Sequence, residues 1–143
     1  KIKKIDYGYV GDIKKIDGDF IKLLIKNKTF PVFCPITANN NGELLNTNAD
    51  TIATMIAIEM VKYFQVDLIY FFDKPGVLIN GRTIKKINNI KFLNYVKNNE
   101  IKDGMIPKIQ NSLEAIRFGV KKVLIGDINI FDKPNNCTEV CLN

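Results

Sequence analysis

The sequence contains no histidine and only three cysteines, and both facts exclude classes of function. Without an imidazole, the chain has no histidine base, which excludes histidine-based nucleophilic catalysis. Cys34, Cys137 and Cys141 have no metal-binding spacing, so a zinc site is excluded as well. A small, odd number of cysteines fits a reducing, cytoplasmic setting better than a disulfide framework. Cys34 stands in an apolar run, where we expect a buried thiol.

The chain also lacks a long apolar run and a dense basic cluster. Its longest apolar stretch, Val66–Phe72, is interrupted by Asp67 and ends at Asp73, well short of the roughly 20 residues that a membrane span needs. The formal net charge is +6, but the lysines are scattered along the chain and no RNA-binding aromatic motif accompanies them. We therefore expect a protein that binds neither membrane nor nucleic acid.

What is present is the composition of an ordinary globular protein. Hydrophobic residues make up 46% and charged residues 25% of the 143 residues, enough for one hydrophobic core. We therefore treat residues 1–143 as a single domain. The sequence begins with Lys1 and shows no signal-peptide pattern, so we expect it to start within a longer reading frame.

Predicted strands and helices alternate along the chain. Apolar or alternating runs predict strands over residues 8–16, 30–36, 66–72 and 122–126, and 3.6-residue periodicity predicts helices over 20–26, 89–98, 107–118 and a long stretch after Asn48. Asn39–Gly42 is a strong turn signal and predicts a hairpin. This alternation is typical of an α/β domain with a mainly parallel sheet.

Ligands of such folds bind where strands end and helices begin, which directs attention to residues 44–50, 73–78 and 100–108. In the first loop, Asn46 and Asn48 offer side-chain amides beside the start of the long helix. The alternative is purely structural, with Asn48 as the helix N-cap and Asp50 complementing the helix dipole.

The other two loops differ in how strongly they indicate ligand binding. In residues 73–78, Gly76 permits a turn with positive φ, and such a loop could lie against a nucleotide, which alone is weak support. In residues 103–108, Gly104 allows close approach of a ligand, and Pro107 places Lys108 in the first turn of a helix. A lysine there opposes the helix dipole, which favours an anionic ligand over the alternative of a solvated surface lysine.

Together the three loops hold amides, a carboxylate and a lysine but no candidate nucleophile. This set suits phosphoryl transfer, in which catalysis is mostly positioning and neutralisation of charge. The sequence has no G-x-x-x-x-G-K-[ST] loop and no eukaryotic-type protein kinase motifs, which excludes those two classes of kinase.

Five segments, in order and spacing, resemble the C-terminal portion of the N-acetylglutamate kinases within the amino-acid kinase family. They are G-Y-V-G-D-I at 8–13, P-V-F-C-P-I at 31–36, N-G-E-L-L-N-T-N-A-D at 41–50, D-K-P-G-V-L at 73–78 and G-M-I-P-K at 104–108. The resemblance implies the amino-acid kinase fold, a three-layer αβα sandwich with a mainly parallel sheet. It also implies that residues 1–143 form the C-terminal, ATP-binding part of it, without the N-terminal half.

The resemblance further implies ATP-dependent phosphorylation of the side-chain carboxylate of N-acetyl-L-glutamate, a step of arginine biosynthesis. Lys108 and Asp50 would be catalytic, the first neutralising the transferring phosphoryl group and the second orienting lysines, while Asn46 and Asn48 would bind substrate. Mg²⁺ would be held through the ATP phosphates, with no metal ligand from the protein. The implied nucleotide-binding residues are Asp73, Lys74, Pro75, Gly76, Val77, Leu78, Glu100, Ile101, Lys102, Gly104 and Met105.

The chain departs from the family pattern in two respects. It lacks the N-terminal half that carries a first catalytic lysine, two glycine-rich loops and a substrate-binding arginine, so we expect the chain to be inactive alone and the complete protein to be a homodimer. Near the end, Cys137–Thr138 stands where the family has Gly-Thr. The alternatives are a kinase for another N-acyl glutamate such as N-succinyl-glutamate, another amino-acid kinase, or a non-catalytic nucleotide-binding remnant.

Overall fold

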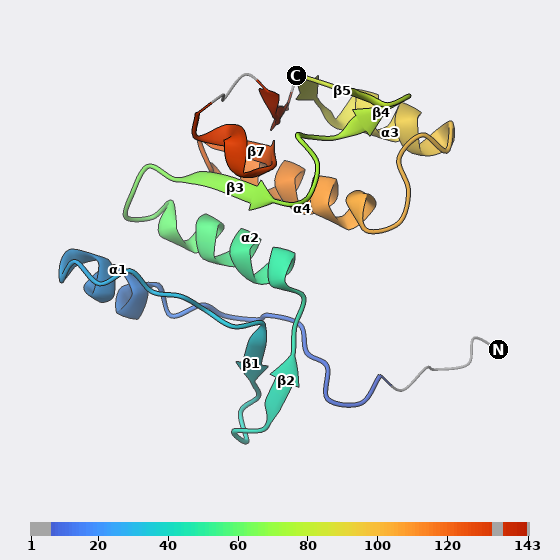
Figure 1. The fold of residues 1–143 in the computed structure, drawn as a ribbon. Coiled ribbons are helices and arrows are strands. Elements are labelled where there is room, and N and C mark those ends of the chain that lie inside the picture. Colours follow the sequence, from blue (N-terminus) through green and yellow to red (C-terminus); the bar gives the residue numbers. More distant parts are fainter. Residues whose placement is uncertain (1–6, 133–135, 143) are drawn as a thin grey trace.

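The computed structural model describes residues 7–132 and 136–142. Within them the chain alternates helices and short strands (Figure 1). The helices are α1 (Gly18–Lys26), α2 (Ala49–Met60), α3 (Asn89–Lys97), α4 (Met105–Arg117) and the 3₁₀ helix η1 (Ile128–Ile130). The strands are β1 (Ile36–Ala38), β2 (Leu44–Asn46), β3 (Asp67–Phe71), β4 (Leu78–Ile79), β5 (Arg82–Thr83), β6 (Lys86–Ile87), β7 (Lys122–Gly126) and β8 (Thr138–Val140).

The central sheet has the strand order β3-β7-β8-β6. β3 runs parallel to β7, with Leu68 opposite Val123, and β6 runs parallel to β8, with Ile87 opposite Val140. β8 is antiparallel to β7. Two of the three pairings are therefore parallel, which confirms the expected α/β class with a mainly parallel sheet.

Helices α2 and α4 pack side by side and cover one face of the sheet, α2 over β3 and α4 over β7 and β8. Successive side chains of β7 point to opposite faces of the sheet, and both faces are buried there. Val123 and Ile125 join the main core with Ile109 of α4, whereas Leu124 packs on the opposite face with Ile130 of η1. The core thus lies between the sheet and the α2–α4 pair.

The helix ends follow the signals in the sequence. The side chain of Asp17 accepts a hydrogen bond from the Phe20 amide (3.0 Å) at the start of α1. Asn48 does the same for the Thr51 amide (3.1 Å) at the start of α2. Gly119, with φ of +96°, ends α4. The predicted hairpin is also present, because β1 and β2 pair antiparallel around residues 39–43.

Two predicted strands in the N-terminal part are wrong. Residues 8–16 contribute only one bridge, from Val10 to Asn46, and of the predicted strand 30–36 only Ile36 belongs to a strand, β1. Phe30 is 92% and Val32 95% exposed, and Cys34 is exposed rather than buried. Apolar sequence alone cannot form a strand, because the strand also needs a neighbour that accepts its backbone hydrogen bonds.

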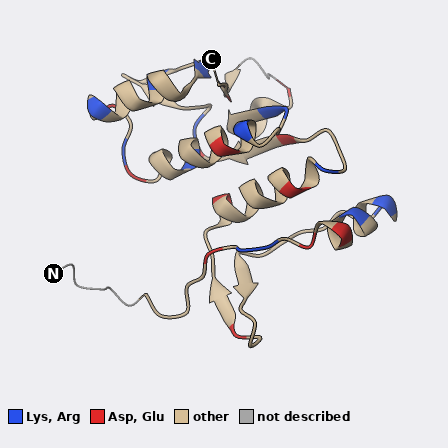
Figure 2. Cartoon of the chain, turned by 180° about the vertical axis from the view of Figure 1, so that it is seen from behind, with Lys and Arg blue, Asp and Glu red and all other residues tan. Residues whose placement is uncertain are grey.

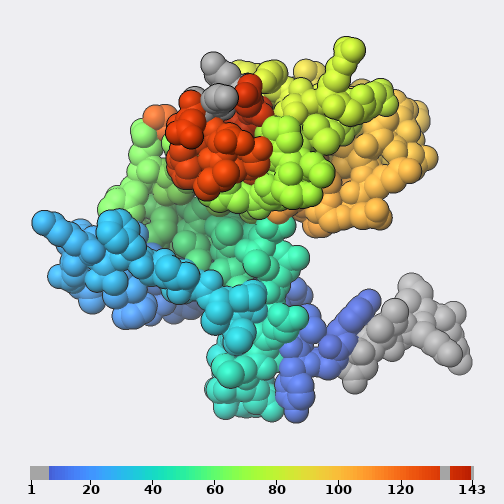
Figure 3. All heavy atoms as spheres, viewed as in Figure 1, coloured from blue at the N-terminus to red at the C-terminus, as the bar shows by residue number. Residues whose placement is uncertain are grey.

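The space-filling view shows the segment before α2, coloured blue to cyan, projecting from the more compact remainder of the molecule (Figure 3). Lysine, arginine, aspartate and glutamate are distributed over the elements rather than gathered on one (Figure 2). This scatter agrees with the absence of a basic cluster from the sequence.

The sequence missed the small β4–β5 hairpin and strand β8. Asn80 (φ +49°) and Gly81 (φ +76°) make the tight turn of that hairpin, a combination typical of two-residue hairpin loops. Cys137 is buried immediately before β8. Of the helices in the described part of the chain, none has the length and apolar character that crossing a membrane requires.

Candidate functional site

The N-termini of α2 and α4 and the carboxyl end of β3 lie on the same side of the molecule, at the right in Figure 1. This arrangement follows from the topology, because α2 and α4 lead directly into the parallel strands β3 and β7 and pack against them, so each helix begins near the end of the strand that follows it. Of the three loops singled out in the sequence, residues 44–50 and 100–108 are joined by the contact between Asp50 and Lys108, and residues 73–78 follow the end of β3 on the same side of the molecule.

Thr47 anchors the beginning of the site. Its buried hydroxyl donates to the Gly11 carbonyl (3.0 Å) and accepts from the Thr37 hydroxyl (2.8 Å), while its amide donates to the Pro35 carbonyl (3.0 Å). A satisfied buried hydroxyl of this kind fixes the backbone around it. As a result, the neighbouring Asn46 and Asn48 side chains, both exposed, are presented from a fixed segment.

Asn48 forms the N-cap of α2 through its side-chain oxygen, which is the structural alternative weighed for this residue. The cap uses the carbonyl oxygen of the side-chain amide, so the NH₂ group is the part that could donate a hydrogen bond to a ligand. Asn46 ends β2, and its backbone pairs with Tyr9 and Gly11. The structure therefore assigns Asn48 a capping contact and leaves ligand binding by both amides as a prediction.

Lys108 of α4 contacts Asp50 of α2, 58 residues away in sequence, through both carboxylate oxygens. Each N–O distance is 2.7 Å, and the side chains are 13% and 30% exposed. A lysine near a helix N-terminus opposes the helix dipole, so the carboxylate offsets an unfavourable position. One turn further along, the Asn111 amide donates to the Thr51 hydroxyl (3.4 Å), which also ties α4 to α2.

The sequence missed Tyr70, which lies beneath this ion pair. Its ring centroid is 4.8 Å from the Lys108 nitrogen, and its hydroxyl is hydrogen-bonded to the Thr54 hydroxyl. Burial raises the pKa of Tyr70 to about 12, although its hydrogen bond with Thr54 works in the opposite direction. A tyrosine inside an apolar strand looks like core in the sequence, and only its position across from α2 distinguishes it.

In the second loop, Gly76 does not adopt the positive φ that glycine permits. Glycine is needed there for space, because a Cβ would lie 2.6 Å from both the Thr138 hydroxyl oxygen and the Thr83 methyl group. Val77 is buried, and its amide donates to the Thr138 hydroxyl (2.8 Å). Thr138 also donates to the Ile84 carbonyl (2.6 Å), so its hydroxyl ties the Val77 backbone to that of Ile84.

The predicted nucleotide-binding residues of this loop therefore differ in how far their side chains are exposed to a ligand. Asp73, Lys74 and Pro75 are exposed, and Asp73 pairs with Lys74 at 3.1 Å. Gly76 and Val77 are buried, and Leu78 is half-buried at the start of β4. Only the first part of the loop thus offers side chains to a ligand.

The third loop divides in the same way. Ile101 is buried in the main core, whereas Lys102 and Gly104 are exposed and Glu100 is half-buried. A Cβ on Gly104 would meet no atom within 4 Å, so open space lies before the first turn of α4, where Met105 is half-buried. This open space is where a ligand could approach the helix N-terminus.

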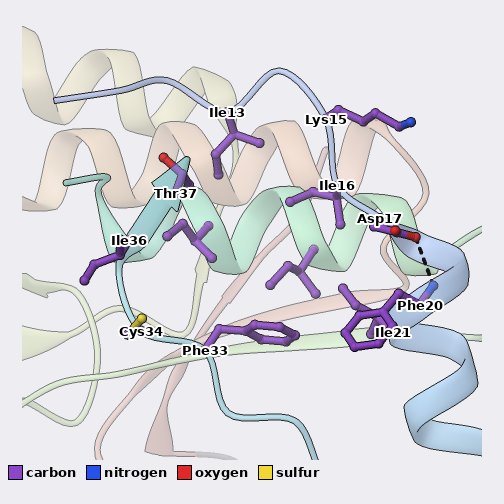
Figure 4. Close-up of a pocket in the computed structure, with 12 residues that line it drawn as sticks. Ile13, Lys15, Ile16, Asp17, Phe20, Ile21, Phe33, Cys34, Ile36 and Thr37 are labelled. Atoms are coloured by element: carbon purple, nitrogen blue, oxygen red, sulfur yellow. Dashed lines mark hydrogen bonds between the residues drawn. The ribbon is translucent and has the colours of Figure 1, made fainter. Parts of the chain in front are cut away.

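An apolar pocket of about 190 Å³ lies elsewhere, between α1, the segment before β1 and α2 (Figure 4). Its lining is mostly aliphatic and aromatic and includes Ile16, Phe20 and Phe33. Neither Asp50 nor Lys108 lines it. Because phosphoryl transfer needs charged and hydrogen-bonding groups, the candidate site remains at the α2–α4 edge.

Comparison with known proteins agrees with the resemblance seen in the sequence. The model of the amino acid kinase family matches residues 1–127. An acetylglutamate kinase of Parabacteroides distasonis is 42% identical over 128 residues, which cover 87% of this chain and 50% of the relative. The chain thus spans about half the length of the curated relatives it matches.

Solved structures give the same result for the fold. The protein smu.665 from Streptococcus mutans superimposes with a TM-score of 0.78 at 35% identity, covering 85% of this chain and 48% of that one. An N-acetylglutamate synthase from Neisseria gonorrhoeae, at 16% identity, superimposes with a TM-score of 0.85 over 100% of this chain and 35% of its own, a likeness of fold alone. With its fold and 127 of its residues matched, the chain belongs to the amino acid kinase family.

Proposed function

We propose that the protein containing this chain is an ATP-dependent kinase that phosphorylates the side-chain carboxylate of N-acetyl-L-glutamate, giving an acyl phosphate for arginine biosynthesis. The observation that carries the proposal is the contact between Lys108 and Asp50 at the paired N-termini of α2 and α4. The name of the Parabacteroides distasonis relative supports the choice of substrate.

The chemistry of the reaction explains why this pair suits it. A carboxylate that attacks a phosphoryl group brings two anions together, and the barrier falls when a cation and oriented dipoles meet the charge of the transition state. Lys108 supplies the cation at the start of α4. Asp50 holds the ammonium in place and orients it, since a flexible lysine otherwise samples many rotamers.

The remaining predicted residues would bind the two reactants. We assign the substrate to Asn46 and Asn48, and the nucleotide to the exposed residues Asp73, Lys74 and Pro75, with the loop that contains Glu100, Lys102 and Gly104. The buried residues Gly76, Val77 and Ile101 would shape these loops from within, together with Leu78 and Met105.

Mg²⁺ would accompany ATP and neutralise the charge on its phosphates. Among the residues that the structure describes, no three metal-ligating side chains gather into a site. In this proposal the metal reaches the site bound to the nucleotide phosphates, the usual arrangement for Mg²⁺ in kinase sites. The same proposal includes a cytoplasmic location and a homodimer of the complete protein. It also assigns residues 1–143 as the ATP-binding part of that protein.

The test is an ATP-dependent acyl-phosphate assay on the complete reading frame, with the product trapped by hydroxylamine. N-acetyl-, N-succinyl- and free glutamate are compared, and we expect turnover with the N-acetyl compound. Turnover with N-succinyl-glutamate alone would mean that the substrate carries a succinyl group instead of an acetyl group. A folded protein that binds ATP but turns over none of the three would contradict the proposal and favour a non-catalytic nucleotide-binding protein or another carboxylate substrate.

A further inference from the structure

The ion pair between Lys108 and Asp50 rests on a buried tyrosine. Tyr70 is 4% exposed near the carboxyl end of β3, and its ring centroid lies 4.8 Å from the Lys108 nitrogen. An ammonium within about 6 Å of a ring centroid is attracted to the negative face of the ring. The Lys108 nitrogen therefore has a second partner besides the carboxylate of Asp50.

The hydroxyl of Tyr70 connects to the other half of the pair. Thr54 donates to the backbone carbonyl of Asp50 (2.7 Å), and since a hydroxyl has one proton, it accepts from the Tyr70 hydroxyl. The Tyr70 oxygen is also 3.5 Å from the same carbonyl of Asp50. Through these hydrogen-bonded hydroxyls, Tyr70 stabilises the first turn of α2, which contains Asp50.

We propose that Tyr70 is a positioning residue for the Lys108–Asp50 pair, its ring holding the ammonium and its hydroxyl holding the α2 turn through Thr54. The role of the pair in phosphoryl transfer rests on the function proposed above. A leucine would fill a similar space in the core but would make neither contact. Burial raises the pKa of Tyr70 to about 12, so the phenol stays protonated and neutral at neutral pH.

Two substitutions separate the two contacts. Tyr70→Phe keeps the ring and removes the hydroxyl, whereas Tyr70→Leu removes both. Thr54→Val breaks the hydroxyl chain without touching Tyr70. The matched control is Tyr63, whose ring lies 4.3 Å from the Lys22 nitrogen and whose hydroxyl donates to Asp19 (3.0 Å), away from the candidate site.

The first readout needs no catalysis. In NMR spectra of the folded protein, the ε-methylene protons of Lys108, assigned with Lys108→Arg, are expected to be shifted upfield by the ring of Tyr70. This shift should persist in Tyr70→Phe and in Tyr63→Phe and vanish in Tyr70→Leu. An unchanged Lys108 signal in folded Tyr70→Leu would overturn the proposal. If Tyr70→Leu does not fold, an unshifted Lys108 signal in the wild-type protein and in Tyr70→Phe overturns it.

The second readout is the acyl-phosphate assay on the complete protein. Loss of the ring in Tyr70→Leu is expected to lower kcat by about 2- to 30-fold, with Tyr70→Phe and Thr54→Val affected less and KM for ATP nearly unchanged. A fall confined to KM, or an equal fall in the Tyr63→Leu control, would overturn the positioning role. If the wild type transfers no phosphoryl group, the proposed function fails. The NMR shift still decides whether the ring of Tyr70 holds the Lys108 side chain.

Discussion

Lys108 is the residue on which the proposed chemistry depends most. Removal of one charge-stabilising donor from a transition state typically costs about 2.7–4 kcal/mol, or about 10²- to 10³-fold in kcat. We expect a loss of this size in Lys108→Ala, with a smaller change in KM for ATP. The acyl-phosphate assay on the purified complete protein measures both constants.

The control for this substitution is Lys91→Ala. Lys91 also lies in the first turn of a helix, α3, but it is exposed and faces no carboxylate in the ion pairs that the structure describes. Its replacement should leave kcat unchanged. Turnover of Lys108→Ala equal to that of Lys91→Ala would remove Lys108 from the mechanism.

Tyr70 makes a prediction about stability at alkaline pH. Burial raises its pKa in the folded chain to about 12, whereas an unfolded tyrosine ionises near pH 10. Its contribution to stability is therefore complete below pH 10 and is lost as the pH rises from about 10 to 12, by at most about 2–3 kcal/mol.

Comparison with Tyr70→Phe isolates this effect, because phenylalanine has no proton to lose. Urea unfolding of both proteins at several pH values should show the wild type losing its advantage over the variant above pH 10. A difference between the two that stays constant with pH would mean that Tyr70 ionises as readily in the folded chain as in the unfolded one.

At the scale of elements, the start of α2 combines a structural and a proposed functional role in Asn48. Asn48→Ala removes the N-cap and is expected to destabilise the protein by about 0.5–2 kcal/mol. Asn48→Asp keeps an oxygen that can accept from the Thr51 amide but removes the NH₂ group. It should retain the stability, measured by urea unfolding, and raise KM for the acyl-glutamate.

The comparison of these two variants separates the alternatives left open by the sequence. If Asn48→Asp keeps both the stability and the wild-type KM, Asn48 serves only as a cap. The aspartate control also has the right charge for a helix N-terminus, so a loss of binding cannot be attributed to a weakened helix.

The elements that were predictable from the sequence are those whose signals are local. The caps at Asp17 and Asn48, the hairpin turn before Leu44 and the apolar run of β3 each follow from a few neighbouring residues. The positions of the three loops also follow from local patterns, because residues 44–50 lead into α2, residues 73–78 follow β3 and residues 100–108 lead into α4. Their part in a functional site stays a prediction. The resemblance to known kinases then added roles that these patterns could not supply.

The elements that the sequence misplaced depend on distant contacts. Residues 30–36 have the composition of a buried strand, yet Phe30 and Val32 are exposed because no neighbouring element covers them. β8 is short and polar at its centre, and its pairing with β7 makes it a strand. Tyr70 was missed because its partners on α2 and α4 lie 16 or more residues away in sequence.

At the scale of the whole molecule, large apolar side chains are exposed mainly in the segment before α2. Phe30 and Val32 are more than nine-tenths exposed, and further exposed side chains of this kind are Tyr7, Tyr9, Val10, Phe20, Leu23, Ile25, Phe33, Ile36 and Leu44. Exposed apolar surface of this extent favours association. We therefore expect the 143-residue chain to associate with itself as its concentration rises, measured by sedimentation velocity.

The surface responsible can be tested by substitution. Replacing both Phe30 and Val32 with serine should shift association to higher concentration without loss of stability, because neither side chain is packed in the folded chain. The control replaces Ile90 and Leu93, exposed on α3, and should leave association unchanged. Because the chain carries a net charge of +6, copies repel one another at low ionic strength, and added salt should strengthen the association. Association that weakens with salt, or that persists in the Phe30→Ser, Val32→Ser variant, would assign the contact to charged groups or to another face.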